Sequence, residues 1–267
     1  MKNAPARPPR TLSQPQIEMA QNLHPFRRRP LRFLLKQLSI PAFSALTRLE
    51  ILGEENLPKS GPLLVVGNHF SFIDPVAFVR LAPWPIEFVG GAENPDAPAW
   101  TRIIPFLWGY HKLYRGTGAR DALRAAEEIL KNGGFLGMFP EGGNWATVLR
   151  PPRPGASFLA TRSGAKILPV GLYGFTGVFP SLGHFRRAKA TIRIGKPFGP
   201  FTASGSGRDR REQLDEIGAK IMRAIAELLP AGMRGHYSDD PAIREAARGT
   251  EIYPWANKVE GEVRHQE

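Results

Sequence analysis

Short apolar runs alternate with amphipathic stretches from residue 63 to residue 194 of this chain. The runs are bounded by Gly, Pro and Asn, as buried strands are, and the stretches between them have the spacing of helices. Strands are predicted at 63–66, 86–89, 110–114, 135–139, 166–172 and 191–194. Helices are predicted at 75–81, 99–107, 120–131, 155–162 and 208–229. Such alternation predicts an α/β fold with a mostly parallel sheet flanked by helices.

The chain divides by composition into four segments. Residues 1–23 are polar and Pro-rich and predict a disordered arm without a secretory signal. Residues 24–49 interleave basic with bulky apolar residues, which predicts an amphipathic segment lying in a membrane interface, or else a helix packed on the domain with its charges in water. Residues 50–230 hold the α/β pattern. Residues 231–267 predict a peripheral extension with a short helix at 241–248.

One histidine and one aspartate lie five positions apart where the first strand passes into the first helix. His69 follows the strand, and Asp74-Pro75 is typical of a helix N-cap followed by Pro at the first helical position. A neutral imidazole in such a loop can take a proton from a hydroxyl, and a carboxylate can fix its tautomer. The alternative is structural: Asp74 caps its helix, and His69 bonds to backbone.

Three further blocks follow in order along the chain. The segment 110–114 predicts a half-buried strand before Arg115, whose guanidinium suits a phosphate. Phe139-Pro140-Glu141-Gly142 predicts a turn that brings one carboxylate and backbone N–H groups close to a ligand. The run 166–172 contains Pro169, which favours an edge strand or a bulge.

The charge balance indicates an anionic partner. The chain has 36 Lys and Arg against 24 Asp and Glu, a formal net charge of +12. Such an excess suits nucleic acid or an anionic membrane surface, and the membrane is favoured because no nucleic-acid-binding motif is present. The chain has no Cys, which excludes cysteine nucleophiles and thiolate metal sites, and no apolar run reaches the roughly 18 residues of a spanning helix.

Taken together and in this order, the four blocks resemble the glycerolipid acyltransferase family of the lysophosphatidate acyltransferase type. That family has a His-four residues-Asp motif preceded by Asn, here Asn68, His69 and Asp74. It then has a strand ending in Arg, here Arg115, and a Phe-Pro-Glu-Gly turn, here Phe139 to Gly142. A strand with an internal Pro follows, here 167–170, and the resemblance covers roughly residues 35–200.

The resemblance implies a reaction and a setting. The acyl donor is acyl-CoA or acyl carrier protein, the acceptor is the free hydroxyl of lysophosphatidate, and no metal or other cofactor is needed. His69 is implied as the general base and Asp74 as its partner. Either Asn68 or a backbone N–H near Glu141-Gly142 is expected to face the developing oxyanion, and Arg115 is expected to bind the phosphate. Peripheral attachment to the cytoplasmic face of a membrane follows as an expectation.

The third motif departs from the family. Thr-Arg or Ser-Arg usually follows Glu-Gly, but this chain has Gly143-Asn144-Trp145, with Arg150 and Arg153 as the next cations. The exact acceptor is therefore left open. The alternatives are an acyltransferase for another lysolipid or lipid alcohol, and a non-catalytic lipid-binding protein of the same fold.

Overall fold

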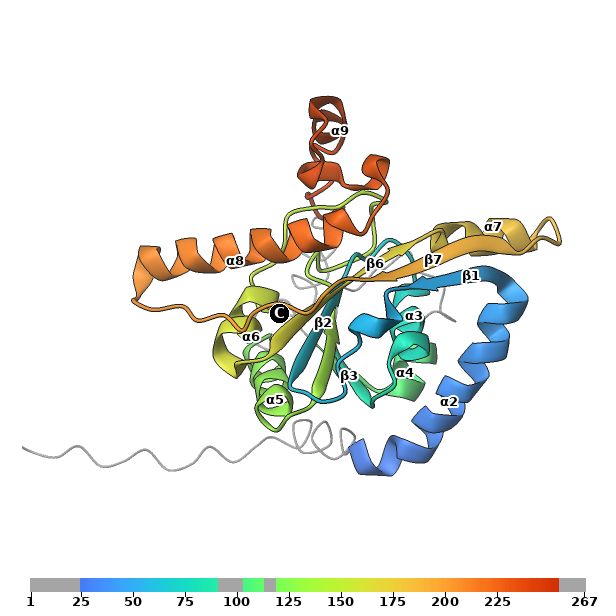
Figure 1. The fold of residues 1–267 in the computed structure, drawn as a ribbon, viewed down its shortest axis with the longest axis horizontal. Coiled ribbons are helices and arrows are strands. Elements are labelled where there is room, and N and C mark those ends of the chain that lie inside the picture. Colours follow the sequence, from blue (N-terminus) through green and yellow to red (C-terminus); the bar gives the residue numbers. More distant parts are fainter. Residues whose placement is uncertain (1–24, 91–102, 113–118, 255–267) are drawn as a thin grey trace, which may run out of the picture.

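The computed structural model describes residues 25–90, 103–112 and 119–254 and has a seven-stranded sheet at its centre (Figure 1). The strand order is β1-β7-β6-β2-β5-β3-β4, and every neighbouring pair is parallel except β6 with β7. The strands are β1 Thr47–Leu52, β2 Leu63–Gly67, β3 Ile86–Gly90, β4 His111–Lys112, β5 Phe135–Met138, β6 Lys166–Tyr173 and β7 Ala188–Ile194.

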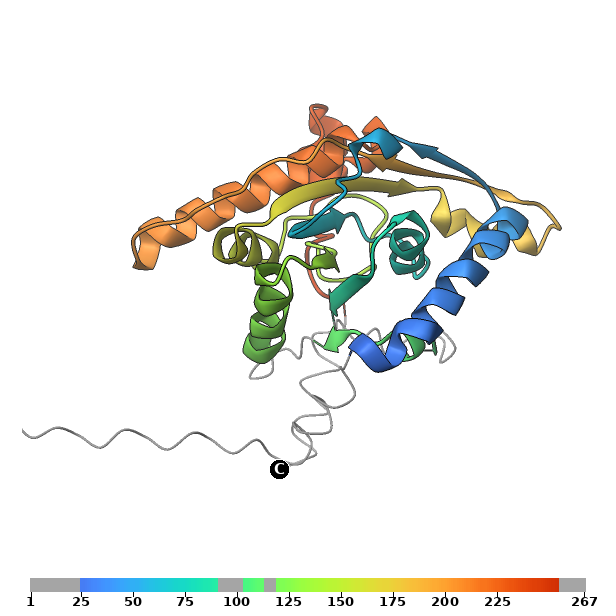
Figure 2. The same cartoon turned by 60° about the horizontal axis from the view of Figure 1, so that its bottom comes forward.

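Helices cover both faces of the sheet. The α-helices are α2 Pro25–Leu46, α3 Asp74–Leu81, α4 Ile103–Trp108, α5 Ala119–Lys131, α6 Gly155–Ser163, α7 Val178–Leu182, α8 Gly207–Glu227 and α9 Pro241–Ala246. The 3₁₀ turns are η1 Glu54–Asn56, η3 Phe175–Gly177, η4 Ala231–Met233 and η5 Gly235–Tyr237. Helices α5, α6 and α8 lie on one face and α2, α3 and α4 on the other (Figures 1 and 2). The α/β fold class predicted from the sequence is confirmed.

Two hydrophobic cores follow from the alternation of side chains along the strands. In β2, Leu64 and Val66 enter the core under α5, α6 and α8, whereas Leu63 and Val65 enter the core on the other face. All four side chains are buried, as expected for a central strand covered on both sides. The strand β2 is thus a rigid support for the loop that follows it.

The glycine at the end of β2 allows a close approach. A Cβ atom added to Gly67 would lie 2.8 Å from the ring of Phe78 and 2.9 Å from the carbonyl oxygen of Val170. Helix α3 therefore packs directly against the end of the strand that precedes it, which fixes the path of the chain between them.

Most predicted elements are present, and two expectations need correction. Strand β1 was not predicted, because its charged and apolar residues merge with the segment before it. Strand β6 is not an edge strand, since β7 and β2 flank it. Between the Val170–Ile194 pair and the Ile167–Phe198 bridge, two residues of β6 face three of the other segment, so the extra residue lies opposite Pro169 and not in its own strand.

Helix α2 directs two cations toward the domain and several large apolar side chains away from it. Arg32 is buried, donates to the carboxylate of Glu87 and to the carbonyl of Trp108, and lies over the Trp108 ring. Lys36 donates to the carbonyl of Ala82. The exposed side chains include four large apolar ones, Phe33, Leu34, Leu38 and Ile40. Two of the basic residues expected to face lipid or water thus face the domain.

The remaining segment predictions have mixed outcomes. Residues 1–23 lie outside the described residues, and β1 crosses the boundary expected between residues 49 and 50. Among the described helices, none is long and apolar enough to cross a membrane. The segment after α8 packs on the body: Leu149 N–H donates to Met233 O, and His236 N–H donates to Leu149 O.

Candidate active site

Three strands bring the predicted motifs to one edge of the sheet. Strands β5 and β6 flank β2 and run parallel to it, so the residues that follow all three strands meet at their carboxyl ends. His69 follows β2, Glu141 follows β5, and Gly174 follows β6. Two of the sequence motifs are therefore neighbours in space although more than 70 residues separate them, as the 2.9 Å bond from His69 N–H to Glu141 Oε1 requires.

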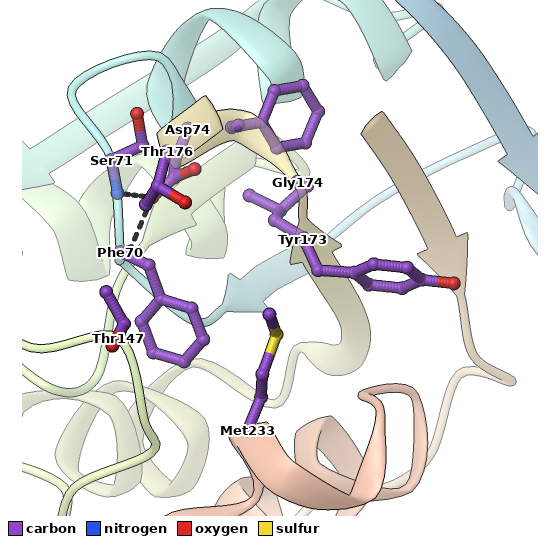
Figure 3. Close-up of a pocket in the computed structure, with 10 residues that line it drawn as sticks. Phe70, Ser71, Asp74, Thr147, Tyr173, Gly174, Thr176 and Met233 are labelled. Atoms are coloured by element: carbon purple, nitrogen blue, oxygen red, sulfur yellow. Dashed lines mark hydrogen bonds between the residues drawn. The ribbon is translucent and has the colours of Figure 1, made fainter. Parts of the chain in front are cut away.

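Asp74 turns back toward the loop before it. Its Oδ2 accepts hydrogen bonds from the backbone N–H groups of Phe70 and Ser71, each at 2.7 Å (Figure 3). Helix α3 begins at Asp74, and its N-cap residue, Ile73, makes no side-chain cap bond. The prediction that Asp74 is the N-cap is therefore wrong. Its carboxylate organises the histidine loop instead of the first turn of the helix.

The same oxygen of Asp74 holds the imidazole. His69 Nδ1 lies 3.0 Å from Asp74 Oδ2. The ring also stacks on Phe139, with centroids 4.3 Å apart and planes 20° apart. A carboxylate beside Nδ1 favours the tautomer with its hydrogen on Nδ1, which leaves the Nε2 lone pair as a proton acceptor. The His69 side chain is 17% exposed, so the ring still reaches the surface.

Burial opposes the charge of Asp74. Removal from water raises the pKa of this carboxyl, while the bonds from His69, Ser71 and Phe70 act in the opposite direction. Three donors on one oxygen are the local arrangement that stabilises an anion in a buried place. The histidine thus has a partner that gains by pairing with an imidazolium.

Glu141 is the second buried carboxylate of this edge. Its Oε1 accepts from the backbone N–H of His69 at 2.9 Å. Its Oε2 accepts from the backbone N–H and the Nε of Arg150, both at 3.1 Å. Burial raises the pKa of Glu141 to about 7, with the Arg150 charge and these bonds acting against it. Glu141 therefore ties the loop after β2 to the loop after β5.

Arg150 folds back onto the altered third motif. Its guanidinium lies 3.8 Å over the Trp145 ring, and Nη2 donates to the carbonyl of Gly143. The side chain is fully buried, and Nη1 has no hydrogen-bond partner among the described residues. Arg150 thus serves the Glu141 loop and is not exposed to a headgroup.

The other predicted site residues have distinct surroundings. Asn68 is fully buried and pairs with the backbone of Leu172, donating to its carbonyl and accepting from its N–H, each at 2.7 Å. This side chain joins β2 to β6, which gives it a structural contact rather than a free donor. Pro140 O accepts from Arg153 N–H at 2.7 Å, and Gly142 has a φ of 77° that favours glycine. Arg115 lies outside the described residues.

Arg150 is the functional residue that the sequence did not assign. Its partner Glu141 lies nine positions before it, across a stretch that starts with two Gly and has no helix or strand periodicity. The only available signal was the missing cation of the third motif, which pointed to Arg150 or Arg153 without distinguishing them. Arg153 remains exposed, and a Cβ at Gly142 would lie 3.1 Å from its Cγ.

A small hollow lies beside Asp74. Phe70, Thr147, Tyr173 and Met233 are among its lining residues, and His69 is not (Figure 3). The hollow lies at the buried side of the dyad, and we assign it no substrate. Among the described residues, no group of three His, Asp or Glu side chains is arranged to hold a metal ion.

Comparisons with known proteins agree with this geometry. The sequence pattern of a family described as Acyltransferase matches residues 48–173. A 1-acyl-sn-glycerol-3-phosphate acyltransferase of Borreliella burgdorferi is 27% identical over 145 residues, which are 53% of this chain and 58% of the relative. A 1-acyl-sn-glycerol-3-phosphate acyltransferase of Chlamydomonas reinhardtii is 26% identical over 197 residues, 70% of this chain and 55% of the relative.

A solved structure shares the fold. The crystal structure of the 1-acyl-sn-glycerophosphate (LPA) acyltransferase PlsC from Thermotoga maritima aligns with a TM-score of 0.55 at 24% identity and covers 75% of this chain and 79% of that one. The chain spans only a little over half the length of these two curated relatives. Residues 48–173 thus carry the sequence pattern of the acyltransferase family, the relatives similar to this chain are named as 1-acyl-sn-glycerol-3-phosphate acyltransferases, and the solved structure shares its fold.

Proposed function

We propose that the protein transfers a fatty acyl group from acyl-CoA or acyl carrier protein to the free hydroxyl of lysophosphatidate, giving phosphatidate. The observation that carries the proposal is the dyad: Nδ1 of His69 lies 3.0 Å from a fully buried carboxylate oxygen of Asp74, at the carboxyl end of a central strand. The relatives named as 1-acyl-sn-glycerol-3-phosphate acyltransferases supply the substrate class.

The reaction needs one base. The acceptor hydroxyl is a poor nucleophile at neutral pH, so Nε2 of His69 takes its proton as the oxygen attacks the thioester carbonyl. The tetrahedral intermediate then collapses, the C–S bond breaks, and the imidazolium returns the proton to the leaving thiolate. The products are an ester and a free thiol. Asp74 stabilises the imidazolium between these steps.

The developing oxyanion needs donors close to His69. Asn68 is already paired with Leu172, and the N–H of Gly142 already donates to Phe139 O at 3.1 Å. We therefore assign the oxyanion to backbone N–H groups that follow Gly142 in the same turn. Glu141 belongs to this turn and also binds the His69 backbone, which fixes the position of the N–H donors relative to the base.

The acceptor phosphate is assigned to Arg115, with Arg153 as a second cation. The motif expected to supply a second cation has Gly143-Asn144-Trp145, and Arg150 is buried against Glu141. Arg153 is exposed beside Gly142 and therefore remains available. One charged hydrogen bond contributes about 1.5–3 kcal/mol. Replacing Arg115 by Ala should thus raise the KM for lysophosphatidate by roughly tenfold or more and leave the KM for the donor nearly unchanged.

Peripheral membrane attachment through residues 24–49 is supported by the outward face of α2. Phe33, Leu34 and Leu38 are exposed on it, and Phe106 of the neighbouring α4 is exposed as well. Because Arg32 and Lys36 face the domain, cations other than these two must provide the attraction to anionic lipid at this helix. Replacing Phe33 and Leu34 by Ser should weaken sedimentation with vesicles, whereas replacing the equally exposed Ile252 by Ser should not.

The decisive experiment is an assay of the purified protein with labelled acyl-CoA or acyl carrier protein and a panel of lysolipids. Phosphatidate formed from lysophosphatidate, and lost in the His69→Ala variant, supports the proposal. Acylation of a neutral or zwitterionic lysolipid instead would favour the second candidate, an acyltransferase for another acceptor, which the altered third motif suggests. Lipid binding without any acyl transfer would leave a non-catalytic lipid-binding protein.

A further inference from the structure

The connection between β6 and β7 projects from one end of the sheet (Figures 1 and 2). It consists of η3, α7 and a turn. We call α7, the turn and the first two residues of β7, residues 178–189, the β6–β7 tip. Three large apolar side chains are exposed on it: Phe179, Leu182 and Phe185. Phe185 is 101% exposed, as much as in an open chain. A single exposed apolar side chain is ordinary, but three large ones on one short connection are typical of an interaction site.

The backbone of the tip makes Phe185 more unusual. Arg186 N–H donates to Ser181 O, and Phe185 N–H donates to Leu182 O, which is the bonding pattern of a Schellman helix end. Phe185 occupies the position of that motif where glycine is usual, and its φ is 54°. It is the one residue other than glycine with a positive φ in the described part of the chain. A bulky residue in the left-handed region is strained.

The charge around the tip is positive. Residues 174–190 contain three Lys and Arg and no Asp or Glu. On the tip, Arg186 and Lys189 are exposed, and Lys189 is paired in register with the exposed Arg48 of β1. Like charges opposite each other on neighbouring strands destabilise a sheet. Glu50 is the acid closest in register, opposite Thr191. An anionic surface would relieve this repulsion.

The base of the tip is fixed and lies close to the site. Arg187 donates to the carbonyl of Thr47, the residue that directly follows α2, at 3.0 and 2.7 Å. At the other side, Gly174 and Thr176 line the hollow beside Asp74 (Figure 3). The projection thus begins next to the dyad and adjoins the end of the helix whose apolar side chains face outward.

We propose that the β6–β7 tip is a membrane contact that inserts into an anionic lipid surface. Phe179, Leu182 and Phe185 enter the apolar edge of the lipid layer. Arg186, Lys189 and Arg48 lie at the level of the headgroups. A short helix end with exposed aromatic and aliphatic side chains and cations around them has the composition of an interfacial anchor. The inference rests on the proposed function insofar as a membrane lipid is the substrate.

The test uses Phe185→Gly in the full chain. Glycine removes the exposed ring and suits a positive φ, so the variant should fold with an unchanged or raised melting temperature. Its partition onto vesicles of phosphatidylcholine with about 30 mol% phosphatidylglycerol should fall by about tenfold, which is the scale for burying one large apolar side chain. Ile252→Ser, at another exposed apolar residue, is the matched control and should bind like the wild type.

A second pair of variants separates the two parts of the contact. Arg186→Gln with Lys189→Gln should weaken binding to the anionic vesicles and leave the weaker binding to pure phosphatidylcholine unchanged. Phe185→Trp should show fluorescence that brominated lipids quench. Wild-type partition by Phe185→Gly, or a tryptophan at 185 that is not quenched, would overturn the inference.

Two other outcomes, a change in oligomeric state and the absence of acyl transfer, have distinct meanings. If Phe185→Gly leaves vesicle binding intact and instead turns a dimer into a monomer in sedimentation, the tip contacts a second copy of the chain and the inference is wrong. Acyl transfer to a monomeric short-chain lysolipid should be the same in Phe185→Gly and the wild type. If the wild type acylates no lysolipid at all, the proposed function fails, while vesicle partition still decides on the membrane contact.

Discussion

Two fully buried carboxylates stand at neighbouring strand ends, and they differ in what they hold. Asp74 bonds an imidazole and two N–H groups of its own loop, all within five positions of the chain. Glu141 bonds the backbone N–H of a distant residue, His69, and a permanent cation, Arg150. The first carboxylate holds the ring that serves as the base in the proposed mechanism. The second fixes the position of the loop that carries that ring. Within one site, Asp74 is thus assigned to the chemistry and Glu141 to the support of the loop.

The largest expected effect comes from the chemical side of this comparison. His69→Ala should lower turnover by at least about 100-fold, the usual scale for losing a general base. Asp74→Asn should also be severe, because an amide can stabilise the wrong histidine tautomer and does not offset an imidazolium. Steady-state assays of both variants, with melting curves to verify folding, measure this. Near-wild-type turnover in both variants would contradict the proposed general-base mechanism.

Arg150→Met is the matching change on the supporting side. It leaves Glu141 buried without its cation, and breaking a buried pair in this way costs about 3–5 kcal/mol of unfolding free energy. Urea unfolding of the variant and the wild type measures the loss. Arg153→Met is the control, since an exposed side chain should change stability by no more than about 0.5 kcal/mol.

A double variant sharpens this test. Arg150→Met with Glu141→Gln removes both charges and should recover a large part of the lost stability, since neutral groups are less costly to bury. Should Arg150→Met prove as stable as Arg153→Met, the Glu141–Arg150 pair does not hold the loop. The division into chemistry and support would then have to be abandoned.

The smallest expected effect is a dependence of stability on pH. Burial raises the pKa of Glu141 from 4.5 to about 7, so the folded protein binds more protons than the unfolded chain between these values. The contribution of Glu141 to the free energy of unfolding should therefore be greatest at and below pH 4.5. It should fall as the pH rises to about 7, by at most about 3 kcal/mol. Urea unfolding from pH 5 to 8 should show this slope in the wild type and a smaller one in Glu141→Gln. Equal slopes would contradict it.

Local patterns of the sequence were enough to predict most of the strands and helices and the proximity of His69 to Asp74. The dyad was predictable because His69 and Asp74 are close in the chain and stand at a strand-to-helix junction. The alternation of apolar runs and amphipathic stretches predicted the strands around β2 for the same reason, since burial on both faces leaves a local signature. The order of the strands had no such signature.

What the sequence did not reveal depends on distant contacts. Arg150 is one of several arginines in a polar, Pro-rich stretch, and only the folded chain brings its guanidinium between Glu141 and Trp145. The outward apolar face of α2 was hidden for a similar reason. Arg32 has the appearance of a solvated charge until Glu87, 55 positions later, is found beside it. Periodicity alone predicts the opposite orientation of the helix.

The pairing of β1 with β7 has a consequence for the order of events during synthesis. Thr47 and Arg187, which bond at the start of this pair, are 140 positions apart in the chain. At a ribosomal rate of about 5–20 residues per second, roughly 7–30 seconds pass between their emergence. Throughout that interval β1 has no strand to pair with. The edge of the sheet nearest the N-terminus is thus completed only after most of the chain has been made.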